Sequence, residues 1–169
     1  KSVVVIGDIA EDGFRRDVPR LLEAADAGNI QLEVRLLPTN KAVNPASGFP
    51  QPDRWAWGGQ AAIRIGQLRQ DGDTDGAKKL FRDLLMASQP TSVLQAFLGS
   101  RPDLLGRGES SVLGEVANTQ RVWNSLKKYR VRGLPVFVID GRLTGRTEIK
   151  MSDNSSVDAL AEILKIIGQ

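Results

Sequence analysis

The chain has 169 residues, of which 41% are hydrophobic and 25% charged, with a formal net charge of +3. These values are typical of a globular protein with one sizeable core, and the small positive excess does not indicate nucleic-acid binding. The absence of cysteine excludes disulfides, thiolate metal sites and dithiol redox chemistry, while the absence of histidine removes the commonest metal ligand. We therefore expect no metal and no cofactor. No apolar run is long enough to span a membrane.

The first forty residues predict a strand, a helix and a second strand. Ser2 to Gly7 is a continuous Val/Ile run, which is typical of a central strand buried on both faces. Residues 14–27 have apolar side chains at helical spacing, with a kink expected at Pro19 and an end at Gly28. Residues 30–37 then alternate between apolar and polar side chains, as in a strand with one polar face. This order predicts a βαβ unit with parallel strands. Because the chain begins directly with a strand pattern, we expect it to be a segment of a longer protein.

A loop is expected over residues 38–52, and the following pattern is helical to about residue 130. We interpret residues 53–130 as a helical insertion, with helices over 53–70, 77–87, 92–98 and 109–130 and with Asp53 as a candidate N-cap. Residues 71–76 predict a polar turn, which lacks the ligand spacing of a calcium-binding EF-hand loop.

Two features of this insertion leave alternatives open. The tryptophans are better explained as core residues than as a ligand cage; they are Trp55, Trp57 and Trp123. The pair Gly58-Gly59 weakens a helix, so it either permits a close helix–helix contact or marks a break.

The last forty residues predict a strand over 131–140, a tight turn at Asp140-Gly141, a second strand over 142–149 and a closing helix over 156–167. The whole chain then reads β-α-β, helices, β-β-α. We expect one α/β domain over residues 1–169, with a central mixed sheet and with the helical insertion inside it.

Two motifs at the ends of the chain resemble the bacterial periplasmic thiol-disulfide oxidoreductases of the DsbA and DsbC/DsbG groups. In that family a strand ends in a motif like Asp-Ile-x-Cys-x-x-Cys-Arg, and residues 8–15 match its spacing with Glu11 and Phe14 in place of the two cysteines. Gly133-Leu134-Pro135 before an apolar strand is similar to the family's second hallmark, a Gly-x-Pro turn with a cis proline. The resemblance covers residues 1–37 and 120–169, and it implies a thioredoxin-like fold.

The resemblance implies a site that has lost its chemistry and retains a surface for binding. We expect a peptide- or protein-binding groove at Gly133, Leu134 and Pro135, since the turn before that proline pairs with extended substrate chains in the family. Basic side chains are expected around this groove: Arg15, Arg16, Lys127, Lys128, Arg130 and Arg132. The alternative is that Pro135 only sets a turn, Leu134 packs inside, and the basic residues are solvated. For Glu11 and Asp12 the alternative is an ordinary acidic helix start.

The hypothesis drawn from the sequence is a cysteine-less, non-catalytic binding or scaffold protein of the bacterial envelope, with a protein or peptide partner. A place in a secretion or conjugation assembly is an analogy within that hypothesis. A holding chaperone similar to the DsbC group is the first alternative. An enzyme of the glutathione-transferase type is the second, although no hydroxyl lies near the lost cysteine and the acidic residues there would repel an anion.

Overall fold

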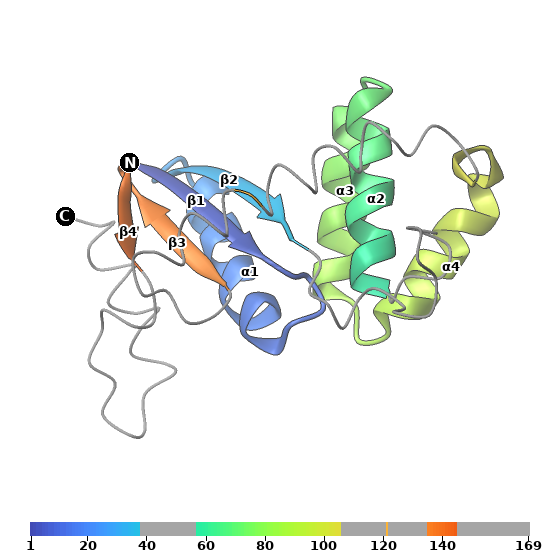
Figure 1. The fold of residues 1–169 in the computed structure, drawn as a ribbon, viewed down its shortest axis with the longest axis horizontal. Helices are drawn as coiled ribbons and strands as arrows, with labels where there is room; N and C mark the ends of the chain where they lie inside the picture. Colours follow the sequence, from blue (N-terminus) through green and yellow to red (C-terminus); the bar gives the residue numbers. More distant parts are fainter. Residues whose placement is uncertain (38–56, 106–120, 122–134, 145–169) are drawn as a thin grey trace. The chain divides into compact units, whose positions relative to one another are not determined.

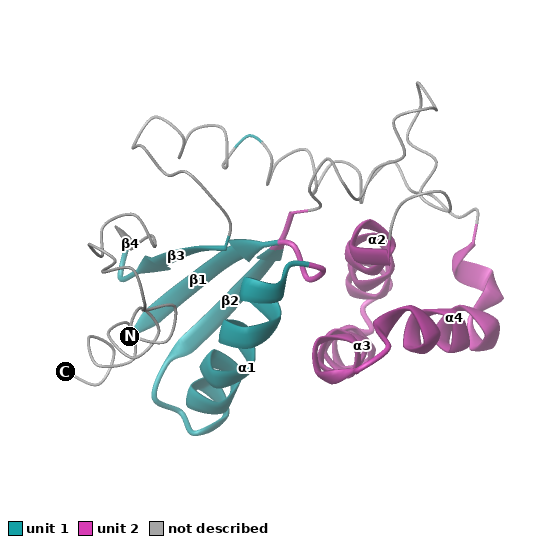
Figure 2. Cartoon of the chain, turned by 90° about the horizontal axis from the view of Figure 1, so that it is seen from below, with its two compact units in different colours: residues 1–7, 11–35, 121–169 teal, residues 8–10, 36–120 magenta. Residues whose placement is uncertain are grey.

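The computed structural model describes residues 1–37, 57–105, 121 and 135–144. It divides the chain into two compact units (Figure 2). Unit 1 contains Lys1–Gly7, Glu11–Arg35 and Arg121–Gln169, and unit 2 contains Asp8–Ala10 and Leu36–Gln120. The β elements and the first helix therefore fall mainly in unit 1, and the remaining described helices fall in unit 2 (Figure 1).

Unit 1 is built on a four-stranded sheet with the order β2-β1-β3-β4. Its strands are β1 (Ser2–Gly7), β2 (Gln31–Leu36), β3 (Val136–Ile139) and β4 (Arg142–Thr144). The arrows of β1 and β2 point the same way, while β1 and β3 pair antiparallel with Val3 opposite Ile139 (Figure 1). The sheet is mixed, and β1 is an inner strand with Val3 and Val5 fully buried. The prediction of a central buried strand is confirmed.

Helix α1 (Asp12–Asp26) covers one face of this sheet (Figure 2). Its buried residues lie at helical spacing and are Phe14, Asp17, Val18 and Leu21. Pro19 lies inside the helix, as its sequence position required. The helix ends in a Schellman motif, in which Gly28 has φ +76° and the Asn29 N–H donates to the Ala24 carbonyl at 2.9 Å.

The predicted hairpin between the last two described strands is confirmed. β3 and β4 pair antiparallel, with Ile139 opposite Arg142. Asp140 and Gly141 both have positive φ, 47° and 77°, as a type I′ turn requires. Asp140 also joins the hairpin to β1, since its N–H donates to the Ser2 carbonyl and its carboxylate accepts from the Ser2 N–H at 2.8 Å. The rest of the predicted strand, residues 145–149, and the predicted helix at 156–167 lie outside the described residues.

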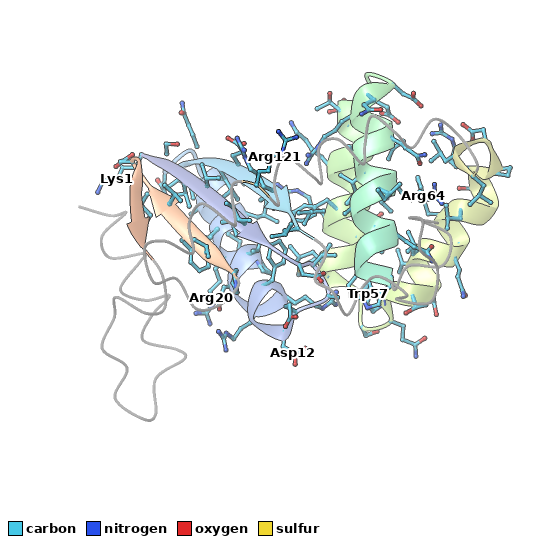
Figure 3. The ribbon with its side chains drawn as sticks, in the orientation of Figure 1. Lys1, Asp12, Arg20, Trp57, Arg64 and Arg121 are labelled. Carbon is cyan, nitrogen blue, oxygen red and sulfur yellow. The ribbon has the colours of Figure 1, made fainter. Side chains whose placement is uncertain are left out.

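Unit 2 contains α2 (Trp57–Gln70), α3 (Thr74–Met86), α4 (Pro90–Ser100) and the 3₁₀ turn η3 (Pro102–Leu104). α2 is buried on every side from Gly58 to Leu68, so it forms the core of this unit. Arg64 on α2 is fully buried (Figure 3). Its guanidinium donates to the Leu104 carbonyl at 3.0 Å, and Gln67 donates to the same oxygen at 3.2 Å. This polar cluster attaches η3 to α2.

Both ends of α4 and the start of α3 differ from the sequence predictions. The expected turn over residues 71–76 is wrong in its second half, because Asp73 caps α3 by accepting from the Gly76 N–H at 2.9 Å, and the helix therefore begins at Thr74. α4 begins at Pro90 rather than residue 92, since a proline fits the first helical turn. It also continues to Ser100, two residues beyond the expected end at residue 98.

Several predictions for the insertion fall on residues that are not described. Asp53, Trp55, Trp123 and the helix at 109–130 lie outside the described residues, apart from Arg121, which is helical. Trp57 is half-buried at the start of α2. The prediction that the tryptophans belong to a core therefore stays a prediction.

Candidate functional site

The two motifs singled out in the sequence meet within unit 1. Gly7 at the end of β1 lies between Phe14 of α1 and Pro135, which directly precedes β3. A methyl group built on Gly7 would lie 2.6 Å from Cδ2 of Phe14 and 3.1 Å from Cβ of Pro135. Only a residue without a side chain permits this approach. The pairing of β1 with β3 explains the meeting, because it places Ile6 opposite Val136, the residue after the proline.

Phe14 fills the position that the resemblance gives to the second cysteine. Its side chain is fully buried, and Pro135 is buried as well. Phe14 shares the inner face of α1 with Val18 and Leu21, so its ring packs into the interior of unit 1. Phe14 is therefore a core residue of unit 1.

The first turn of α1 carries negative charge and no thiol or hydroxyl group. Glu11 is the N-cap residue, with φ −79° and ψ 133°, and its side chain makes no capping hydrogen bond. Asp12 follows in the first turn and is exposed (Figure 3). Both carboxylates are favoured by the positive end of the helix dipole, and both would oppose binding of an anion there. The local chemistry supports an ordinary acidic helix start.

Arg15 and Arg16 differ in their surroundings, although the sequence suggested the same role for both. Arg15 is half-buried, and this burial lowers its pKa, with an opposing influence from the Asp12 carboxylate. Arg16 donates from Nε and Nη2 to the two oxygens of Asp17, at 2.7 and 3.2 Å. The hydrogen bond to Asp17 is the main reason that the pKa of Arg16 is raised. Arg16 is therefore engaged by a neighbour on its own helix.

Asp17 was not expected to be important, yet it is a carboxylate buried to 3% exposure on the inner side of α1. The sequence indicates this burial through residue spacing, because Asp17 falls on the same helical face as Phe14 and Leu21. An acidic residue at such a position is easily assigned to the solvent side of a helix.

The remaining site predictions concern residues that are not described. Gly133, Leu134 and Arg132 lie outside the described residues, as do Lys127, Lys128 and Arg130. The predicted groove at Leu134 therefore stays a prediction. All of residues 8–15, including Glu11, Phe14 and Arg15, are described, and so is Pro135 from the second motif.

A second close approach lies in unit 2, where the segment Asp8–Ala10 contacts the start of α2. Asp8 is buried, and its Oδ1 accepts from the Ala10 N–H at 2.9 Å. A methyl group built on Gly58 would lie 2.5 Å from Oδ1 of Asp8 and 2.9 Å from Cβ of Ala10. Gly58 does make a close contact, but its partner is the turn at Asp8–Ala10 and not the second helix that was expected.

Two kinds of site are not found among the described residues. No cluster of acidic side chains suited to a metal ion occurs in the described ranges. Within those same ranges, no helix has the length and apolar character needed to cross a membrane.

The sheet order, the helix after the first strand and the proline before β3 define a thioredoxin-like fold. The comparison with solved structures agrees. The chain is similar to a thioredoxin-like oxidoreductase from Silicibacter pomeroyi DSS-3, with a TM-score of 0.59 and 20% sequence identity over 97% of this chain and 86% of that chain. At this identity the likeness concerns the fold. No family model matches the chain, and no curated protein matches it.

Proposed function

We propose that this chain is a non-catalytic, cysteine-less relative of the DsbA/DsbC-type proteins that acts by binding a protein or peptide in the bacterial cell envelope. The observation that carries the proposal is the contact of Phe14 with Gly7 beside Pro135. A thioredoxin-like fold surrounds the site, while the aromatic ring of Phe14 occupies the position where a thiol would react. A chain without cysteine has no group for thiol exchange.

The chemistry of the first turn of α1 disfavours the glutathione-transferase alternative. Glutathione would be bound as a thiolate, which needs a hydrogen-bond donor or positive charge near the helix start. Glu11 and Asp12 supply carboxylates instead. The envelope location, and a role in a secretion or conjugation assembly, are parts of the proposal that rest on the family resemblance alone.

The test is a pull-down from a bacterial envelope extract, with partners identified and quantified by mass spectrometry. Wild type is compared with Leu134→Asp, which places a charge in the predicted groove. Met86→Asp is the matched control, because Met86 is an apolar side chain 69% exposed at the end of α3. Circular dichroism establishes that each variant is folded.

The proposal expects one or two stoichiometric partners that are lost with Leu134→Asp and kept with Met86→Asp. Many sub-stoichiometric unfolded clients would instead indicate a holding chaperone. Partners retained by a folded Leu134→Asp variant would overturn the use of this groove. Specific retention on a glutathione resin would reinstate the transferase alternative.

A further inference from the structure

β2 is the outer strand of the sheet in the described part of the chain, because its neighbour there is β1 alone. The outer edge of such a strand presents backbone N–H and C=O groups to any strand that approaches. Leu32 and Val34 are half-buried, while Glu33 is exposed. Glu33 and Arg35 lie on the same side of the strand and form an ion pair of 2.7 Å between Oε1 and Nε.

One hydrogen bond identifies the residues whose backbone groups face outward. The Gln31 N–H donates to the Lys1 carbonyl at 2.8 Å, so Gln31 bonds toward β1. Along a strand, the backbone N–H and C=O groups of successive residues point alternately to one edge and to the other. The backbone groups of Glu33 and Arg35 therefore also face β1. The backbone groups of Leu32, Val34 and Leu36 therefore face the outer edge, and these residues would form the hydrogen-bonded pairs with an added strand.

We propose that β2 is a dimerisation edge, at which a second copy of this chain pairs antiparallel through its own β2 about a two-fold axis at Val34. This register places Glu33 opposite Arg35 of the partner subunit, and it does so twice because the interface is symmetric. Val34 meets Val34 of the partner subunit as a hydrogen-bonded pair. The two Glu–Arg pairs fall at non-hydrogen-bonded positions, where facing side chains are closest.

The charge pattern selects this register over its neighbours. In an antiparallel pair, residues whose backbone groups face the outer edge must lie opposite residues of the same kind in the partner strand. The two-fold axis can therefore move along β2 by a whole residue but not by half a residue. An axis at position 33 would set Glu33 against Glu33 of the partner subunit, and an axis at position 35 would set Arg35 against Arg35 of the partner subunit. Like charges directly opposite are unfavourable. Self-complementary charge about Val34 is the reason for choosing a second copy as the occupant.

A pairing of two strands this short is small beside a standard protein interface, so a dissociation constant of roughly micromolar or weaker is expected. Sedimentation equilibrium up to about 1 mM protein covers this range.

We expect Glu33→Arg and Arg35→Glu each to raise the dissociation constant by about tenfold or more, since each creates two like-charge pairs. The double variant restores opposite charges and returns the constant close to that of wild type. Asp83→Lys makes the same change in charge as Glu33→Arg at an exposed position of α3, and it should leave the dissociation constant unchanged.

A backbone variant provides a second test. The Val34 N–H faces away from β1, so Val34→Pro removes a donor from the dimer edge and none from the described sheet. It should abolish dimerisation in a protein that keeps its circular dichroism spectrum. If it does not fold, the charge series decides. A monomer at every concentration, or a dimer that neither single charge variant weakens, overturns the proposal. Neither result depends on Leu134, so this proposal and the proposed binding function fail separately.

Discussion

Gly7 and Phe14 are so close that a methyl group on the glycine would lie 2.6 Å from the phenylalanine ring. The strand that ends in Gly7 and the helix that carries Phe14 therefore meet without room for a side chain. The Cβ atom of Pro135 would lie 3.1 Å from the same methyl group. This contact joins segments from the two ends of the sequence.

Gly7→Ala should lower the free energy of unfolding by about 1–3 kcal/mol, because the added methyl group overpacks a buried position. Chemical denaturation followed by circular dichroism measures the change. Gly99→Ala is the matched control, since nothing lies within 4 Å of that position in α4, and it should stabilise the protein by up to about 1 kcal/mol. Equal effects of the two substitutions would contradict the close packing of Gly7.

Gly58→Ala should destabilise unit 2 through its clash with Asp8 and Ala10, again by about 1–3 kcal/mol. Asp8→Ala removes one of the two clashing groups, so the double variant should lose less stability than the sum of the single variants, with a coupling of at least about 0.5 kcal/mol. Additive effects in this double-mutant cycle would show that Gly58 and Asp8 do not constrain one another.

Asp73→Ala should cost about 1 kcal/mol of stability, because it leaves the Gly76 N–H at the start of α3 without its cap. Asp73→Asn is the control and should retain most of the stability, since its amide oxygen can accept the same hydrogen bond. The cap also makes calcium binding unnecessary to explain the acidic residues here. A rise in melting temperature on adding calcium would reverse that interpretation.

Introducing cysteines at positions 11 and 14 tests whether the fold can position a redox motif there. Glu11→Cys combined with Phe14→Cys should form an intramolecular disulfide and reduce a disulfide substrate in the presence of a dithiol reductant. The Phe14 substitution empties a fully buried position, so the reduced variant should be less stable by about 2–4 kcal/mol. Mass spectrometry detects the disulfide. Glu11→Cys alone is the control, because a single thiol cannot form the bond within one chain.

If the folded double variant stayed reduced under oxidising conditions, positions 11 and 14 would not be the counterparts of the two cysteines. The resemblance would then hold for the fold without extending to the site. Disulfide formation without activity would place the remaining defect outside these two positions, for example at the acidic Asp12 in the first turn.

The sequence by itself determined the local elements of unit 1. An uninterrupted Val/Ile run reads as an inner strand, Asp140-Gly141 as a tight turn, and the spacing of Phe14, Val18 and Leu21 as one helix face, because these signals arise from backbone preferences and burial within one element. It also excluded thiol chemistry, since that depends only on which atoms the chain contains.

The tertiary structure decided the relationships between elements. Phe14 packs on Gly7 next to Pro135, Gly58 lies against Asp8, and Asp17 faces the interior. These relationships depend on which surfaces meet in the fold. The spacing of residues within one element does not predict them. The same holds for β2: its alternating pattern predicts a strand, but only the sheet order makes it an outer strand. Packing between segments far apart in the chain is a property of the assembled fold, and so is the site that such packing creates.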